Sequence, residues 1–171
     1  QLSIPFLKNY DALNAAFVFQ GQPCIVHDLY DKETGEVKLH LQRYTASAFE
    51  EDGPPQFIDV LNYSTAAVYL TELKLRVAHS PDGEKLLLYY DKMGSSGFKV
   101  VWCCVLGPDF SVVWKASYKI PVFAYGGNSV VSLTDQGEVL LGLSGVEITD
   151  DLRKEDEGIK VVAANFKRAS F

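Results

Sequence analysis

The stretch Gly97-Phe98-Lys99-Val100-Val101 recurs 61 positions later as Gly158-Ile159-Lys160-Val161-Val162. The same step of 61 residues separates three phenylalanines, Phe49, Phe110 and Phe171, each of which closes a similar short stretch. Self-similarity at a fixed period is the signature of a repeat architecture. The sequence therefore predicts about three structural units, each of about 61 residues.

Hydrophobic patterning predicts strands throughout these units. Apolar and polar residues alternate from Val37 onward, as in a half-buried strand, and the continuous apolar run Phe98–Leu106 is typical of a strand covered on both faces. Glycine turns at Gly21, Gly83 and Gly137 precede a strand in each unit, since glycine adopts positive φ without a Cβ clash. The strands predicted after these turns are Cys24–Tyr30, Lys85–Tyr90 and Glu138–Leu143, then Val37–Tyr44, Phe98–Leu106 and Ile159–Phe166, and finally Phe57–Leu61 and Ser111–Ile120.

The expected fold is all-β, with antiparallel four-stranded units that repeat along the chain. Such units are the plan of a β-propeller blade, and we place them at residues 10–63, 72–121 and 128–171 of a single domain or fragment. A closed propeller has roughly four to eight blades. We therefore expect the sheet edges to pair with the chain's other end, a second copy or the rest of a longer chain, with a β-sandwich or barrel as the alternative fold.

Two hairpins carry a resemblance to known repeat families. The stretch Ala78-His79-Ser80-Pro81-Asp82-Gly83-Glu84-Lys85-Leu86-Leu87 resembles the hairpin of WD40-like and TolB-like propeller blades. The stretch Leu133-Thr134-Asp135-Gln136-Gly137-Glu138-Val139-Leu140 resembles the Asp-x-Gly turn of NHL-like and YVTN-like blades. The chain departs from WD40 repeats because it has no Gly-His or Trp-Asp dipeptide, and its repeat is longer than that of the other families. The resemblance implies a propeller fold and no particular activity.

Composition narrows the classes of partner. The chain has 171 residues and a net charge of −6, and it contains no Lys/Arg cluster, which argues against nucleic acid as a partner. No apolar run approaches the roughly 20 residues of a membrane span, so we predict a soluble protein without membrane insertion, in a compartment that the sequence does not specify. Its three cysteines, Cys24, Cys103 and Cys104, do not form a disulfide framework, and we interpret them as buried thiols, although a Cys24 bridge stays open.

Residues with catalytic chemistry are scattered. The histidines His27, His40 and His79 suggest acid–base or metal roles only if carboxylates converge on them, and His27 and Asp28 point to opposite faces of a strand. Asp28, Asp31 and Asp91 lie at or after the ends of predicted strands, where aspartate side chains typically cap turns. We therefore predict no catalytic, cofactor-binding or metal-binding residue. Four tyrosines could stack on a ligand if exposed together: Tyr89, Tyr90, Tyr118 and Tyr125.

Three functional hypotheses follow from the sequence. The first is a non-catalytic propeller-like binding or scaffold module with a protein or carbohydrate ligand. The second is part of a propeller hydrolase or lyase, in which His and Asp or Glu from different blades would converge. The third is a β-sandwich or barrel domain that binds a small ligand. In each case we expect a core that includes Leu39, Leu86, Leu88, Val100, Trp102, Val113 and Leu140.

Overall fold

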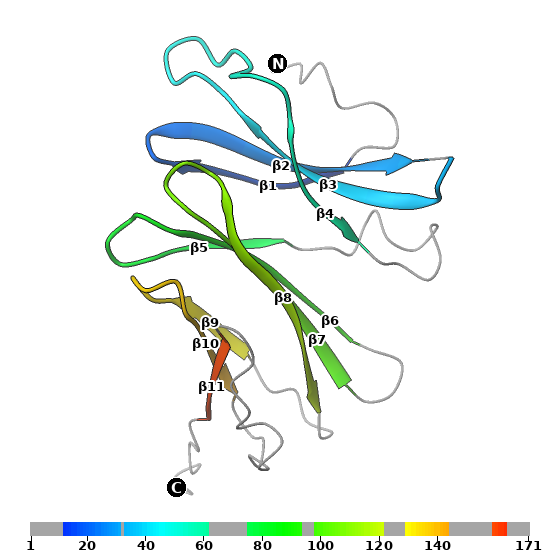
Figure 1. Cartoon of the computed structure of the whole chain (residues 1–171), viewed down its shortest axis with the longest axis vertical. Coiled ribbons are helices and arrows are strands. Elements are labelled where there is room, and N and C mark those ends of the chain that lie inside the picture. Colours follow the sequence, from blue (N-terminus) through cyan, green and yellow to red (C-terminus); the bar gives the residue numbers. More distant parts are fainter. Residues whose placement is uncertain are drawn as a thin grey trace, which may run out of the picture. The chain divides into compact units, whose positions relative to one another are not determined.

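A computed structural model of the chain describes residues 12–31, 33–61, 75–93, 98–121, 129–143 and 159–163. The described residues form strands joined by turns and loops, and none of them lies in a helix (Figure 1). The all-β prediction is thus confirmed. The chain divides into two compact units, residues 1–76 and 77–171.

The first unit contains a four-stranded antiparallel sheet. Its strands are β1 (Ala12–Phe19), β2 (Gln22–Asp31), β3 (Glu36–Arg43) and β4 (Gln56–Leu61). They lie side by side in chain order, β1-β2-β3-β4, and each is antiparallel to the next. Alternating side chains of β3 point into the core, where Val37, Leu39 and Leu41 are buried.

A second four-stranded antiparallel sheet repeats this plan. Its strands β5 (Arg76–His79), β6 (Leu86–Met93), β7 (Phe98–Leu106) and β8 (Val112–Pro121) again follow chain order. Every residue of β7 from 101 to 106 is buried, which confirms that this strand is covered on both faces. Two successive four-stranded antiparallel sheets of the same topology are what the repeat in the sequence predicts.

The third sheet differs from the prediction. It contains β9 (Ser129–Leu133), β10 (Val139–Leu143) and β11 (Ile159–Ala163) in the order β11-β10-β9. β9 and β10 form an antiparallel hairpin, but β11 runs parallel to β10, with Val139 opposite Ile159. The antiparallel direction predicted for the strand at Ile159 is therefore wrong. A parallel neighbour requires a long crossover instead of a hairpin, and residues 144–158 connect these two strands.

The predicted glycine turns occupy equivalent places in the three sheets. Gly21, Gly83 and Gly137 have φ values of 73°, 74° and 83° and lie between the first two strands of their sheets. In the second and third sheets a hydroxyl oxygen closes the turn: Ser80 Oγ accepts the Lys85 N–H at 2.9 Å, and Thr134 Oγ1 accepts the Glu138 N–H at 3.0 Å. Local turn chemistry therefore explains why the repeat is visible in the sequence.

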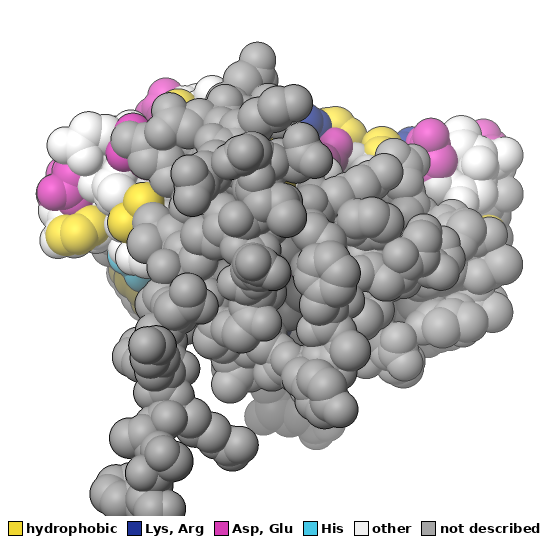
Figure 2. Space-filling view, turned by 90° about the horizontal axis from the view of Figure 1, so that it is seen from below, with side chains coloured by type: hydrophobic (Ala, Val, Ile, Leu, Met, Phe, Trp, Pro, Cys, Tyr) yellow, Lys and Arg dark blue, Asp and Glu magenta, His cyan; other side chains and the backbone are white. Residues whose placement is uncertain are grey.

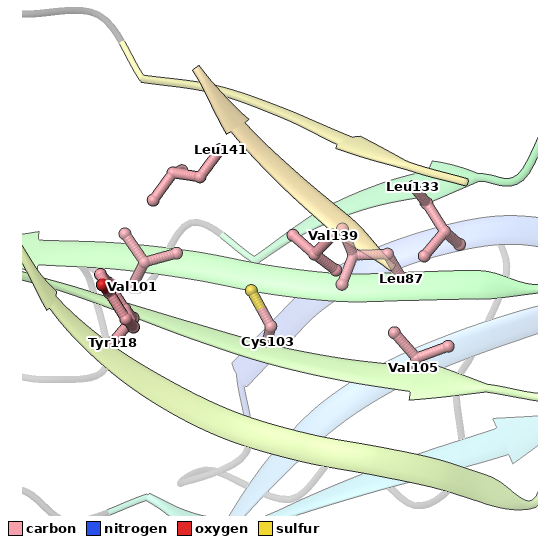
Figure 3. Close-up of a cluster of buried hydrophobic side chains, with 8 residues drawn as sticks. All are labelled: Leu87, Val101, Cys103, Val105, Tyr118, Leu133, Val139 and Leu141. Carbon is pink, nitrogen blue, oxygen red and sulfur yellow. The ribbon is translucent and has the colours of Figure 1, made fainter. Parts of the chain in front are cut away.

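The core of the second unit lies between its two sheets. Side chains on one face of β6, β7 and β8 pack against β9 and β10 (Figure 3). The cluster consists of Leu87, Val101, Cys103, Val105, Tyr118, Leu133, Val139 and Leu141. Burial of this apolar surface stabilises the unit by about 25 cal/mol for each Å² removed from water.

Four of the seven predicted core residues are buried, namely Leu39, Leu86, Leu88 and Trp102. Val100 and Leu140 are only half-buried; Leu140 lies on the face of β10 opposite Val139 and Leu141. Val113 is 53% exposed, so its predicted burial is wrong. The reason is a bulge: Val105 pairs with Trp114 and Leu106 with Val112, which leaves Val113 as the extra residue.

Candidate functional site

Of the four tyrosines singled out in the sequence, the three that the structure describes do not form an exposed group. Tyr118 belongs to the buried cluster of the second unit, and Tyr89 packs against that cluster from β6. Tyr90 is 6% exposed and stacks on Trp102, with a distance of 5.2 Å between ring centroids. Tyr125 lies outside the described residues. Stacking on a ligand requires exposed rings. The rings of Tyr90 and Tyr118 are buried and contribute to packing instead.

Two of the histidines meet across neighbouring strands. His27 on β2 pairs directly with His40 on β3, and their rings stack at 5.7 Å. Phe57 on β4 continues the row, with its ring edge-on to His40 at 5.8 Å. The row passes from buried His27 through half-buried His40 to half-exposed Phe57. Asp28 pairs with Leu39 on the opposite face, as expected for neighbours in a strand.

Acidic residues at strand ends are bonded within their own turns. Asp31 accepts hydrogen bonds from Lys38 Nζ at 2.7 Å and from the backbone N–H groups of Glu33 and Thr34. These bonds, first of all the one from Lys38, lower the pKa of Asp31 to about 2. The prediction that Asp31 caps a turn is confirmed.

Asp82 and Asp109 repeat this use of a carboxylate in the second unit. Ser80 Oγ donates to Asp82 Oδ1 at 2.5 Å, and Ser111 Oγ donates to Asp109 Oδ1 at 2.6 Å. Each hydroxyl lowers the pKa of its aspartate, and backbone N–H donors of the same turn lower it further. Hydrogen bonds that favour the charged form keep these carboxyl groups ionised.

Cys24, Cys103 and Cys104 are buried and form no disulfide. Cys103 belongs to the core cluster, and burial raises the pKa of its thiol to about 12. Burial likewise raises the pKa of Cys24 to about 11, an effect that the charge of Arg43 partly offsets. Such thiols are inert compared with the low-pKa thiolates of reactive sites. Within the described ranges, no group of three His, Cys, Asp or Glu residues could hold a metal ion.

The loop between β3 and β4 carries an exposed aromatic ring on a rigid frame. The ring of Phe49 stacks on buried Tyr44, with centroids 4.6 Å apart and planes inclined by 10°. Phe49 N–H donates to Thr45 O at 2.9 Å, and Thr45 N–H donates to Glu50 O at 2.8 Å. The sequence marked Phe49 as part of the repeat but gave no sign of the stack.

Polar side chains from the sheet hold the far end of this loop. Gln22 Nε2 on β2 donates to Asp52 Oδ2 at 2.8 Å, and Gln42 Nε2 on β3 donates to Gly53 O at 3.0 Å. Asp52 N–H donates to Arg43 O at 2.9 Å. These bonds fix the loop to the two central strands of the first unit.

Acidic residues follow the exposed ring. Glu50 and Glu51 are exposed, and Glu51 forms an isolated antiparallel bridge with Tyr44. Residues directly opposite in such a pair direct their side chains to the same face. Burial, and after it the negative charge of Glu51, raise the pKa of Tyr44 to about 12. Both observations place the Glu51 carboxylate near the ring stack.

The described surface mixes acidic and apolar side chains elsewhere as well. In Figure 2, Asp and Glu side chains lie beside hydrophobic ones along the margin of the face seen from below. The large apolar side chains exposed among the described residues are Val18, Phe49, Phe57, Val112 and Val113. No helix within the described part of the chain is long and apolar enough to cross a membrane.

Comparisons with known proteins give little further information. No family model matches the chain, and no curated protein matches it. Among solved structures, the chain is similar to the endo-arabinase from Bacteroides thetaiotaomicron VPI-5482, with a TM-score of 0.43 and 14% sequence identity. The similarity covers 77% of this chain and 50% of the arabinase, so the chain spans about half the length of that protein. A similarity of this size transfers neither fold nor activity.

Proposed function

We propose that this chain is a non-catalytic binding or scaffold module built from propeller-like four-stranded sheets. The observation that carries the proposal is that acidic side chains in the turns accept hydrogen bonds from their own turns. Asp31, Asp82 and Asp109 each accept hydrogen bonds inside their own turns, and the pKa of each is lowered. A general acid in an enzyme has the opposite perturbation, because it must hold a proton near neutral pH, and these carboxylates already accept hydrogen bonds from Lys38, Ser80 and Ser111.

The thiols support the same conclusion. A nucleophilic cysteine needs a lowered pKa and access to solvent. Cys24 and Cys103 have raised pKa values and are buried. These side chains therefore serve packing in the sheets.

The exposed apolar side chains supply the binding component. Phe49 lies on a rigid loop and Phe57 on the edge strand β4, where they are 41% and 50% exposed. Loops held on a rigid scaffold are the usual place for binding residues. The proposed ligand is a protein or a carbohydrate, and pairing of sheet edges with another copy or with further chain is a second mode of association.

A pH titration of all carboxyl groups by carbon-13 NMR tests the proposal. We expect Asp31 to titrate near pH 2, and Asp82 and Asp109 below the usual range of aspartate. A carboxyl group that titrates above about pH 6, together with turnover of a glycoside or ester that is lost when this group is replaced by its amide, would overturn it.

A further inference from the structure

The ring of Phe49 is far more exposed than that of its counterpart in the second sheet, Phe110. Phe49 and Phe110 occupy the same place in the loop after the third strand of their sheets, and both have positive φ, 54° and 66°. This conformation is unfavourable for a bulky residue. Phe110 is 4% exposed, so burial of its ring offsets the strain. Phe49 is 41% exposed and gains less from burial. A strained residue whose burial offsets the strain only in part indicates a role outside the fold.

The geometry of the stack leaves one surface for a partner. Tyr44 covers one face of the Phe49 ring, so the exposed area lies on the other face and its edges. The frame of hydrogen bonds through Thr45 holds the ring in place before any partner arrives. Such a pre-ordered ring loses little conformational entropy on binding.

Charge indicates the chemistry of that partner. Glu51 lies on the same side of the strand pair as Tyr44, and exposed Glu50 adds a second negative charge. The whole chain carries a net charge of −6. An aromatic face next to carboxylates attracts a cation, and the planar guanidinium group can stack on the ring while its N–H groups reach a carboxylate.

We propose that the Tyr44–Phe49 stack and Glu51 form a docking point for an arginine side chain on a basic segment of a partner protein. The proposal rests on the binding function inferred above and names the ligand class of that module. The guanidinium plane lies over the free face of Phe49, and its N–H groups donate to the Glu51 carboxylate. The corresponding loop of the second sheet lacks this chemistry, because Phe110 is buried and Ser111 and Val112 follow it.

The test uses the full chain and three small probes: the N-acetyl amides of arginine, lysine and citrulline. Aromatic NMR shifts of Phe49 and Tyr44 report binding. We expect saturable shifts with the arginine probe, weaker binding of the lysine probe, and none of citrulline, which has nearly the same shape as arginine but no charge. Equal binding of citrulline and arginine would overturn the proposal, and so would the absence of any shift with the arginine probe at about 50 mM, a concentration that detects a Kd up to about 0.5 M.

Variants with matched controls localise the site. Phe49→Leu and Glu51→Gln should each raise the Kd for the arginine probe about threefold or more. Val18→Ala removes an exposed apolar side chain elsewhere in the same unit, and Glu33→Gln removes an exposed charge from another loop. Both should leave the Kd unchanged. Weakening by the controls equal to that by the site variants would show attraction to the acidic chain as a whole and would overturn the site.

One further variant guards against misfolding. Phe49→Tyr keeps the ring and should bind the arginine probe like the unaltered chain, which separates loss of the ring from damage to the loop. Loss of binding in Phe49→Tyr with a native spectrum would count against stacking. A chain that binds no arginine probe and has no carboxyl group with a raised pKa would overturn this inference alone. Turnover coupled to such a carboxyl group would instead overturn the proposed function.

Discussion

Replacement of Gly137 by alanine should destabilise the second unit more than the same change at Gly83. Both residues have positive φ, 83° and 74°, so each alanine is held in a left-handed conformation that costs about 1–2 kcal/mol. Alanine also lowers the conformational entropy of the unfolded chain, which reduces the net destabilisation by about 0.4–1 kcal/mol. At Gly83 no atom lies within 4 Å of the new Cβ, so the net cost there is about 0.5–1 kcal/mol.

At Gly137 the surroundings add a second cost. The new Cβ would lie 3.2 Å from Lys85 Cδ and 3.5 Å from Lys85 Cε. Lys85 Nζ donates to Asp135 O at 2.5 Å, so a shift of the side chain away from the new Cβ strains this hydrogen bond. Crowding and the weakened bond add about 1 kcal/mol or more. The expected total for Gly137→Ala is about 2 kcal/mol.

Urea denaturation followed by tryptophan fluorescence measures both variants in the same unit, because Trp102 and Trp114 lie on β7 and β8. Trp114 Nε1–H donates to Gly137 O at 2.9 Å, so its emission also reports the state of this turn. The reasoning fails if Gly83→Ala lowers the free energy of unfolding as much as Gly137→Ala does.

Three other predictions follow from the described contacts. Leu141→Ala removes a side chain from the buried cluster and should lower the free energy of unfolding by about 2–5 kcal/mol. Val113→Ala at the exposed bulge should change it by less than about 0.5 kcal/mol. Equal effects of the two substitutions in thermal melts would contradict the assigned core. The pKa of Asp31 is lowered from 3.8 to about 2, so its contact with Lys38 should stabilise the fold fully above pH 3.8 and lose this effect as pH falls toward 2; acid unfolding of Asp31→Asn should not show that loss. Burial raises the pKa of Cys103 to about 12, so a thiol reagent at pH 8 should modify this residue only on unfolding, and rapid labelling of the native chain would disprove its burial.

Elements governed by local chemistry were predictable from the sequence. The Ser80–Lys85 and Thr134–Glu138 turns are closed by their own hydroxyl groups and glycines, so short motifs were sufficient to locate them. The apolar run of β7 correctly indicated burial on both faces.

Features that depend on register or on long connections were not predictable in this way. β11 is parallel to β10, and no turn motif in the sequence of residues 144–158 specifies this direction. The exposure of Val113 follows from a bulge of one residue, which turns a side chain away from the face that periodicity assigns. The contact of His27 with His40 needs the exact pairing of β2 with β3, although a hairpin centred between Glu33 and Thr34 would have indicated it.

At the candidate site the backbone conformation repeats between the two sheets, but the surroundings of the phenylalanine ring do not. The 61-residue step places Phe49 and Phe110 in the same left-handed conformation, and this part of the repeat is a property of the chain itself. The step does not determine what surrounds each ring: one is buried, and the other stacks on Tyr44 with a face in solvent. Selection for the fold acts on both positions alike, so a difference between equivalent residues is where a role in binding can be recognised. By that criterion the loop from Thr45 to Asp52, rather than the core tyrosines, is the part of this chain to test first for a partner.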